Sequence, residues 1–528
     1  IFHTLSILFI LNPACFPFPF GNNVLVSNLI RHPTRKPFSP FFSITMSEDD
    51  GFNLKNWVWI PDGSFFSKGY VTDYLPAGKC RVTVTEGNTE TNKTVNLDQL
   101  ENCKPAKFNK CNDMAELTHL NEPSVVYNLY LRYNDDMIYT YSGLFLVAIN
   151  PYKSLKIYDQ DTLKKYHTHD AKEKPAPHIF AIAEGTYRNL LMNDKDQLIL
   201  VTGESGAGKT ENTKKIIQYL SLISSETSST HDIDTKTLQA NPILESFGNA
   251  KTIKNNNSSR FGKFIKIYVL EKGSIDGANI EYYLLEKLRV VHAVKNERNY
   301  HVFYQVLKGD GNFLKKFKLD ADTKSYRYLK ESQSTIPGVD DAKDFNSLKE
   351  AFSIVGFKDE EVTMIFQVIA IILHLGNLDF NLWKLEQATF TASSPLGTIA
   401  ELLGVSKSEL ELNFIKPKVK AGREFVLKSR NASAVRYAID AFAKYLYERI
   451  FQYIIQRIND NLDIVSSSSN YKFIGVLDIA GFESFDINSF EQLCINYTNE
   501  KLQQFFNHHS FILEQSEYLR EDIQWEFI

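Results

Sequence analysis

The sequence predicts an α/β fold: a core with a mixed, mostly parallel sheet and large helical insertions, preceded by a small β-barrel. Three observations predict it. Beyond residue 110, apolar strand-like runs alternate with segments of helical periodicity. At residues 203–210, a glycine-rich motif stands between one of these strands and a helix. Between residues 56 and 100, short strand-like pieces are separated by turn signals.

The composition bounds the class of protein. A chain of 528 residues is long enough for two or more domains, or for one domain with large insertions. Its 43% hydrophobic and 23% charged residues are ordinary for a globular protein, and a net charge of -4 gives no reason to expect nucleic acid as a partner. Five scattered cysteines do not suggest a disulfide scaffold. No apolar run is long enough for a membrane span.

Residues 1–45 differ from the rest of the chain. Phe, Pro and Ser dominate, no acidic residue stands before Glu48, and the first methionine is Met46. This is what translated upstream sequence ahead of a real start would look like. A targeting peptide is the alternative, because the segment is acid-free, but no basic region precedes its apolar part and its prolines break any amphipathic helix. We therefore predict a disordered or translated upstream segment.

The remaining chain divides into two modules. Residues 56–100 hold four short strand-like pieces with turn signals between them, which predicts a small barrel of the SH3-like kind without a catalytic constellation. Residues 110–528 carry the α/β pattern, and within them residues 286–465 are mostly helical in periodicity. The second module therefore contains the predicted core and its insertions.

The glycine-rich motif is a P-loop. It comes directly after the apolar run 198–201 and opens a predicted helix over residues 211–224. Its residues are Gly203, Glu204, Ser205, Gly206, Ala207, Gly208, Lys209 and Thr210. The glycines let backbone N–H groups cradle phosphates at a helix N-terminus, Lys209 adds a point charge, and the Thr210 hydroxyl is placed to ligate Mg²⁺. The core is therefore predicted to be that of a P-loop NTPase.

Two further polar stretches, each beside a strand, narrow the range of reactions that the P-loop alone would allow. The hydroxyls and amides of Asn255–Lys263 (NNNSSRFGK) can reach Mg²⁺ and the γ-phosphate. Asp478–Glu483 (DIAGFE) follows an apolar strand at its C-terminal end, where open α/β sheets bind ligands. The acid that opens this second stretch suits Mg²⁺ held through water, and Glu483 can pair with Arg260. The three motifs together predict triphosphate chemistry.

The three motifs together resemble those of the myosin motor domain. GESGAGKT, NNNSSRFGK and DIAGFE match its P-loop, switch I and switch II, and we use these three names below for residues 203–210, 255–263 and 478–483. The resemblance extends from about Trp57 to Ile528 and is strongest to conventional, class II heavy chains. Further matching stretches are Asn150–Lys153, Asn241–Thr252, Glu297–His301 and Leu493–Gln503.

The resemblance implies ATP and Mg²⁺ as cofactors. Lys209 and Asn255 would contact phosphates, while Thr210 and Ser259 would ligate Mg²⁺ and Asp478 would hold it through water. The adenine side resembles the stretch that contains Asn150, Pro151 and Tyr158. The full set of implied nucleotide-binding residues is Asn150, Pro151, Tyr158, Gly203, Glu204, Ser205, Gly206, Ala207, Gly208, Lys209, Thr210, Glu211 and Asn255.

The resemblance also implies which residues take part in hydrolysis. Ser258 would lie beside the γ-phosphate and the attacking water, and Gly481 would donate its N–H to the γ-phosphate. Arg260 and Glu483 would form the pair that closes the back of the pocket and helps to orient the water. These roles suit phosphoryl transfer, where positioning and electrostatic stabilisation supply most of the catalysis.

An actin-activated Mg-ATPase of the cytoplasmic actin cytoskeleton is the function that the resemblance implies, with actin filaments as partner. Residues 286–465 resemble the upper actin-binding subdomain and Lys416–Glu424 an actin-contacting loop, while Asn488–Tyr518 matches the relay helix as one long helix. The motor would be incomplete at its C-terminus, without one central strand and the converter, and light chains and a second heavy chain would bind only if the protein continues past Ile528. The alternative is a short nucleotide- or actin-binding protein without motor output.

Overall fold

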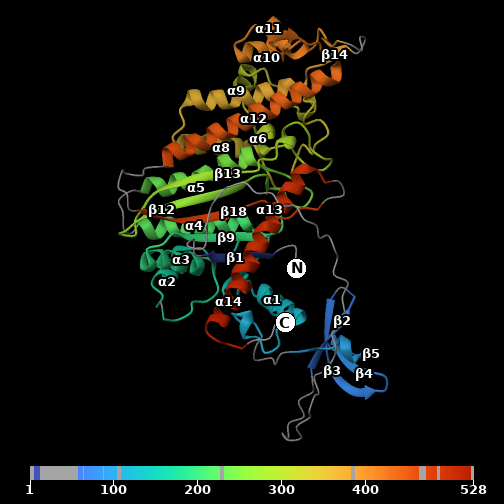
Figure 1. Cartoon of the computed structure of the whole chain (residues 1–528), viewed down its shortest axis with the longest axis vertical. Coiled ribbons are helices and arrows are strands. Elements are labelled where there is room, and N and C mark those ends of the chain that lie inside the picture. Colours follow the sequence, from blue (N-terminus) through green and yellow to red (C-terminus); the bar gives the residue numbers. More distant parts are fainter. Residues whose placement is uncertain are drawn as a thin grey trace. The chain divides into compact units, whose positions relative to one another are not determined.

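The computed structural model describes most of the chain beyond residue 56 and a short segment near its start (Figure 1). The described ranges are 5–11, 57–63, 65–86, 89–103, 109–170, 172–225, 231–381, 387–462, 471–484 and 488–524. They fall into two compact units: residues 57–135 form one, and the other holds residues 5–11 together with the chain from residue 136 onward. Each unit is considered by itself.

The smaller unit is a five-stranded antiparallel sheet followed by one helix. Its strands pair in the order β5-β4-β3-β2-β6, so nearly all neighbours are also neighbours in sequence. Val58, Ile60, Cys80, Val82 and Val84 form its apolar core. The elements are β2 Trp57–Asp62, β3 Phe65–Leu75, β4 Lys79–Glu86, β5 Thr89–Asn96, β6 Glu101–Asn102 and α1 Glu122–Asn134. Among the described residues no ladder joins β5 to β6, so the predicted closed SH3-like barrel is not confirmed.

A seven-stranded sheet lies at the centre of the larger unit. Its order is β13-β12-β18-β9-β1-β8-β7. The strands are β1 Leu5–Leu11, β7 Tyr139–Ser142, β8 Phe145–Ile149, β9 Gln197–Gly203, β12 Gly262–Leu270, β13 Ile275–Tyr283 and β18 Tyr471–Asp478. The sheet is mixed, as predicted, but "mostly parallel" is wrong: β18 and β9 form its single parallel ladder. Antiparallel ladders dominate because two hairpins, β7–β8 and β12–β13, supply four of the seven strands.

Strand β1 lies in the interior of this sheet. It pairs antiparallel with β8 on one side and with β9 on the other (Figure 1, dark blue). Its sequence, LSILFIL, is apolar almost throughout. Residues 1–45 were predicted to be a disordered or translated upstream segment; within them the structure describes residues 5–11, which form this strand. Residues 12–45 lie outside the described residues.

Helices flank the sheet near its parallel pair of strands. α3 Ile179–Asn193 and α4 Lys209–Ser225 pack against each other, and both contact β9 and β18. α5 His231–Gly248 contacts α4 and β13, while α2 Gln160–His167 packs on α3. α4 begins where β9 and the P-loop end, so the sheet fixes the direction from which its N-terminus approaches the carboxyl edge of the sheet.

The region after β13 is mostly helical. α12 is its longest helix and buries one face with residues at helical spacing, among them Val435, Ile439, Tyr447 and Ile454. Its elements are α6 His301–Val306, α7 Gly311–Lys316, α8 Asp341–Val355, α9 Asp359–Gly376, α10 Leu396–Leu403, α11 Lys407–Ile415 and α12 Ala432–Leu462, with the short strands β14 Phe380–Asn381, β15 Thr389–Phe390, β16 Lys418–Ala421 and β17 Glu424–Leu427. The pair β10 Asn249–Ala250 and β11 Ser258–Ser259 lies ahead of β12.

The last described segment is one helical rod with an irregular middle. α13 Phe490–Asn507 begins at a capping box formed by Ser489 and Gln492, which satisfies orphan N–H groups of its first turn. A π-helical turn, His508–Ile512, then leads into α14 Leu513–Arg520 (Figure 1, red). The segment predicted as one helix is therefore continuous, but its α-helical hydrogen-bond pattern is interrupted by the π-helical turn. None of the described helices has both the length and the apolar character needed to cross a membrane.

Candidate functional site

The backbone of the P-loop surrounds the ammonium group of Lys209. It runs from the end of β9 to the first residue of α4, and Gly206 and Gly208 adopt φ values of +87° and +95°, which glycine tolerates best. The Lys209 ammonium donates to the carbonyl oxygens of Gly203 at 2.7 Å and Glu204 at 2.8 Å. Burial lowers the pKa of Lys209 to about 8. A buried cation is thus held at the floor of the site.

Oxygen ligands from three separate segments meet beside the P-loop. The Thr210 hydroxyl donates to Asp478 Oδ2 at 2.9 Å and lies 3.4 Å from the hydroxyl oxygen of Ser259. Lys263 Nζ lies 3.5 Å from the same Asp478 oxygen. Two hydroxyls and a carboxylate form the hard-oxygen set that Mg²⁺ prefers. The residues predicted as metal ligands are therefore together, and their chemistry fits this ion.

A cavity of about 150 Å³ is enclosed by the P-loop and both switches. Ser205 and Ser258 bring their hydroxyl oxygens within 3.3 Å of each other across it. Gly481 approaches so closely that a Cβ there would lie 2.4 Å from the Gly203 carbonyl oxygen and 2.7 Å from Lys209 Nζ. The lining residues are Asn150, Ser205, Gly206, Gly208, Lys209, Thr210, Glu211, Asn255, Asn257, Ser258, Ser259, Ile479, Ala480 and Gly481. Switch II can pass this close only because position 481 has no side chain.

Behind this cavity the two switches are joined by a buried ion pair. Both Nη atoms of Arg260 donate to the Glu483 carboxylate, Nη2 at 2.9 Å, and Nη1 also donates to the Ser258 hydroxyl at 3.2 Å. Arg260 is 0% exposed and Glu483 is 2% exposed. Arg260 Nε donates to a second carboxylate, that of Glu286, at 2.6 Å. Burial alone would lower the pKa of Arg260, but these two carboxylates outweigh it and raise the pKa well above its usual value.

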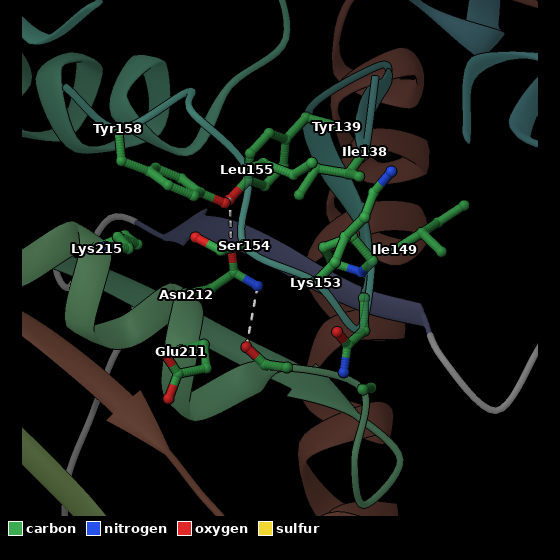
Figure 2. A pocket seen from close by; sticks show the side chains of 14 residues that line it. Ile138, Tyr139, Ile149, Lys153, Ser154, Leu155, Tyr158, Glu211, Asn212 and Lys215 are labelled. Atoms are coloured by element: carbon green, nitrogen blue, oxygen red, sulfur yellow. Dashed lines mark hydrogen bonds between the residues drawn. The ribbon is translucent and has the colours of Figure 1, made fainter. Parts of the chain in front are cut away.

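A larger cavity of about 310 Å³ adjoins the first (Figure 2). Asn150, Gly208 and Glu211 line both, and Ala207, Pro151 and Tyr158 line the larger one. Asn150 donates from Nδ2 to the Gly206 carbonyl oxygen at 2.8 Å, so this side chain also braces the P-loop. The lining here is a mixture of aliphatic, aromatic and polar side chains, as small-molecule sites have. From the smaller cavity beside the P-loop, this larger cavity extends toward β7 and β8.

Several residues of the larger cavity were not predicted from the sequence. The Tyr139 and Tyr158 hydroxyl oxygens lie 2.8 Å apart, Tyr139 also donates to Asn212 Oδ1 at 2.8 Å, and Asn212 donates to the Gly208 carbonyl oxygen (Figure 2). Lys215 Nζ lies 4.6 Å from the centre of the Tyr158 ring. Asn212 and Lys215 follow Lys209 by three and six residues, so helical spacing from the P-loop could have revealed them. Tyr139 carries no such signal.

Glu286 and Lys263 were also missed among the charged residues. Lys263 stands at the end of the switch I motif, and its contact with Asp478 follows from the antiparallel pairing of β12 with β18, which sets these two residues opposite each other. Glu286 lies just after β13 and reaches Arg260 across the fold. No motif marks it, because its role depends on tertiary placement alone.

The fold and the site together define a P-loop NTPase-type core with two switch segments. The family model described as "Myosin head (motor domain)" matches residues 111–528. The chain is 51% identical over 477 residues to myosin type-2 heavy chain 1 of Schizosaccharomyces pombe, covering 90% of this chain and 31% of that protein. It is 50% identical over 507 residues to Myosin-1 of Saccharomyces cerevisiae, covering 89% of this chain and 26% of that protein.

The chain therefore belongs to the myosin head (motor domain) family. It is also similar to myosin type-2 heavy chain 2 of Schizosaccharomyces pombe, with 49% identity over 484 residues, which are 91% of this chain and 23% of that protein. The predicted resemblance to class II heavy chains is confirmed by these relatives. The chain spans a third or less of the length of the curated relatives that it matches.

Proposed function

We propose that this chain binds and hydrolyses MgATP in the two adjoining cavities. The observation that carries the proposal is the meeting of P-loop and switches at one point, where Ser259 and Asp478 both lie within hydrogen-bond reach of the Thr210 hydroxyl. Membership of the myosin head family supports ATP as the nucleotide. The smaller cavity would take the phosphates, and the larger would take the base and sugar.

In this proposal the phosphates are bound by charge and by backbone groups together. Lys209 releases the carbonyl oxygens that it now contacts and binds phosphate oxygens instead, which suits a lysine whose charge is otherwise weakly solvated. Asn255 and the N–H groups of residues 205–209 bind the remaining oxygens at the N-terminus of α4. Gly481 brings its N–H to the terminal phosphate from the opposite wall.

Hydrolysis itself would depend on the positioning of water. Ser258 lines the phosphate cavity and faces the place of an attacking water, and its hydroxyl is oriented by the bond that it accepts from Arg260. The Arg260–Glu483 pair closes this end of the cavity, and its complete burial supports a site from which bulk solvent is excluded. Positioning and preorganised charge are what phosphoryl transfer chiefly requires.

Thr210 and Ser259 would hold Mg²⁺, with Asp478 acting through water. The ion would neutralise charge on the phosphates when bound. Asp478 is buried and already accepts a hydrogen bond from Thr210 and a charge contact from Lys263, so its carboxylate is fixed in place before any ligand arrives. This arrangement orients the hydroxyl ligand of the P-loop.

Switch II is also bonded to the last helix, which supports a coupled motor. Asn496 of α13 donates to the Glu483 carbonyl oxygen at 2.7 Å and accepts from the Glu483 N–H at 2.8 Å. Asn499 donates to the Ala480 carbonyl oxygen at 2.9 Å. A displacement of switch II would therefore move α13 with it, and we propose that this movement is the output of the site.

Actin filaments are the proposed partner of the helical region, in the cytoplasmic actin cytoskeleton. The hairpin β16–β17 exposes the basic side chains Lys418, Lys420 and Arg423, which suit an acidic filament surface. We also propose that residues 56–100 form the SH3-like module, which the strand order β5-β4-β3-β2-β6 supports. Reversal of charge at Lys418 and Lys420 should weaken co-sedimentation with actin filaments by about tenfold at low salt and leave basal ATP turnover unchanged.

Phosphate release by the purified full-length natural protein tests the proposal. We expect steady hydrolysis of ATP with Mg²⁺, little hydrolysis in EDTA, and faster turnover when actin filaments are added. Binding of a fluorescent ATP analogue should be measured in parallel. Nucleotide binding without hydrolysis in a folded protein would contradict the ATPase, and hydrolysis that actin does not change would contradict only the actin partner.

A further inference from the structure

The loop of residues 253–260, which contains most of switch I, is bonded at both of its ends to one buried ion network. On one side, Arg260 Nε donates to Glu286 Oε2 at 2.6 Å, and the Glu286 N–H donates to the Arg260 carbonyl oxygen at 3.0 Å. On the other side, the Ile253 N–H donates to Glu297 Oε1 at 3.3 Å. Arg289 joins the two carboxylates, with Nε 2.6 Å from Glu286 Oε2 and Nη1 2.9 Å from Glu297 Oε2. One network therefore sets the positions of both ends of the loop.

The middle of the loop is held by a separate set of polar contacts. The side-chain oxygen Oδ1 of Asn257 accepts from Asn249 Nδ2 at 3.0 Å and lies 3.2 Å from His301 Nε2, while Asn257 Nδ2 donates to Glu245 Oε2 at 3.2 Å. Burial is the largest cause that lowers the pKa of His301 to about 4, so the ring is neutral at physiological pH. These contacts hold the loop but do not reach Arg260.

Glu286 lies at the centre of the ion network. Its Oε2 atom accepts from both Arg260 and Arg289, so it stands between two buried guanidinium groups of like charge. Although burial alone would raise the pKa of the Glu286 carboxyl, the two arginines outweigh it and lower the pKa to about 2. Without this charge the two guanidinium groups would repel each other in a site that solvent screens poorly. Arg260 would then lose both its anchor and its orientation.

The two carboxylates on Arg260 differ in what holds them. Among the described residues, the hydrogen bonds of the Glu286 carboxylate are with Arg260 and Arg289, whereas Glu483 belongs to switch II and is bonded through its backbone to Asn496 of α13. They also use different edges of the guanidinium: Glu286 takes Nε, and Glu483 takes the two Nη atoms. Because the two carboxylates use different nitrogen atoms, the bond between Arg260 and Glu286 does not require the contact between Arg260 and Glu483.

We propose that Glu286 is a positioning residue for hydrolysis, which fixes Arg260 so that Glu483 closes onto a preset partner. The proposal rests on the ATPase proposed above. Glu286 acts on the reaction only through Arg260, so its removal lowers the rate of the chemical step and leaves the groups that bind phosphate in place. Its effect also depends on the presence of the Glu483 carboxylate.

A double-mutant cycle tests this dependence. In the full-length natural protein we compare Glu286→Gln, Glu483→Gln and the double variant for MgATP turnover and for binding of a fluorescent ATP analogue. Glu286→Gln should lower kcat by about 10- to 100-fold, the scale of a small misplacement of a positioning group, with KM changed less than about threefold. In the Glu483→Gln background the same change should cost less than about twofold. If the role of Glu286 were purely structural, Glu286→Gln would lower kcat by the same factor in the wild-type protein and in the Glu483→Gln variant.

Asp341→Asn is the matched control. Asp341 is also a buried carboxylate paired to an arginine, with both Nη atoms of Arg298 on its oxygens at 3.0 and 2.7 Å. Among the hydrogen bonds of the described residues, Arg298 meets the network through its backbone carbonyl oxygen, which accepts from Arg289 Nη1 at 2.9 Å, and its guanidinium is not bonded to Glu286 or Arg260. Asp341→Asn should lower the melting temperature as Glu286→Gln does while leaving kcat within about twofold. Glu286→Asp keeps the charge and should restore part of the lost kcat, and it replaces Glu286→Gln in the cycle if the Gln variant does not fold.

Three results would overturn the proposal. Turnover of Glu286→Gln equal to that of wild type would remove the role of Glu286, as would additive losses in the double variant. If Asp341→Asn loses turnover to the same degree, the loss in Glu286→Gln is explained by a general loss of stability. If the wild-type protein binds the analogue but hydrolyses no ATP, the proposed ATPase itself is wrong. Hydrolysis by wild type together with an unchanged Glu286→Gln contradicts only the role given to Glu286.

Discussion

The two adjoining cavities of the site are built by different physical means. The smaller one is walled by backbone groups, hydroxyls and the buried Lys209, and the buried charges of Asp478 and of the Arg260–Glu483 pair lie behind its lining. The larger one is walled by side chains such as Ile138, Ile149, Leu155 and the Tyr158 ring, with a short chain of hydroxyl and amide bonds. Buried charge distinguishes the first cavity, whereas the charged side chains that line the second, Lys153, Glu211 and Lys215, are exposed or half-buried.

This difference predicts a division of labour. Buried charges act strongly on developing charge because little solvent screens them, so changes in the smaller cavity should alter the rate of the chemical step or abolish phosphate binding. Apolar and aromatic contacts are made equally in the ground state and the transition state, so changes in the larger cavity should alter affinity and leave kcat nearly unchanged. Variants in each cavity test whether kcat and nucleotide affinity respond in these different ways.

Removal of the P-loop charge should give the largest effect. Lys209→Ala takes away the buried cation that faces the phosphates, and we expect nucleotide affinity to fall by about 100-fold, the scale of a lost charge-assisted hydrogen bond to phosphate. Fluorescent-nucleotide titration measures this. Lys318→Ala, at an exposed ion pair with Glu401, is the control and should bind as wild type does. Retained affinity in Lys209→Ala would mean that phosphates do not enter the smaller cavity.

The Arg260 pair should affect rate more than affinity. Arg260→Lys keeps the charge but cannot make the two-edged contact with Glu483 and Glu286, so we expect kcat to fall by about 10- to 100-fold. Nucleotide affinity should change by less than about threefold, because Arg260 lies behind the cavity rather than in its lining. Steady-state and single-turnover kinetics separate the two. A fall confined to affinity would contradict the division of labour.

Tyr158 is the matching test in the larger cavity. Tyr158→Ala removes the ring that Lys215 covers and should weaken nucleotide binding by about tenfold while kcat stays within about twofold. Tyr158→Phe removes only the hydroxyl bonded to Tyr139 and should weaken binding by about threefold. Equal effects of the two variants would show that the hydroxyl, and not the ring, carries the contact.

A pH titration should change nucleotide affinity less than Tyr158→Ala does. The pKa of free Lys209 is about 8, and bound phosphates favour its charged form, so the pKa rises on binding. Binding therefore takes up a proton above pH 8, and affinity should be flat below that value and fall about fivefold between pH 8 and pH 9. Adenosine, which has no phosphates, is the control and should bind equally at both values. A flat profile for ATP, or the same fall for adenosine, would contradict this assignment.

The sequence allowed prediction of the phosphate half far better than of the base half. P-loop, switch I and switch II are contiguous motifs, because consecutive backbone N–H groups and hydroxyls can act only when they are adjacent in the chain. Tyr139 and Asn212 meet across separate strands and helices, and their pairing depends on the fold. Glu286 reached Arg260 in the same way. Tertiary contacts between isolated residues leave no local pattern to find.

The fold shows the same limit. Strand and helix identities followed from periodicity, including β9, α4 and β18 around the site. The direction of pairing did not, because alternation of strands and helices favours parallel ladders while the hairpins β7–β8 and β12–β13 produce antiparallel ones. The interior place of Leu5–Leu11 was also missed, since an apolar run at the start of a chain carries no sign of its distant partners β8 and β9.

Single-turnover hydrolysis of MgATP by wild type, Arg260→Lys and Tyr158→Ala, each at saturating nucleotide, tests the central claim most directly. If charge in the smaller cavity supplies the chemistry and contact in the larger supplies affinity, Tyr158→Ala should hydrolyse bound ATP at the wild-type rate, and Arg260→Lys should be slower by about 10- to 100-fold. Equal rates in all three proteins, or a loss of rate in Tyr158→Ala as large as that in Arg260→Lys, would contradict the account.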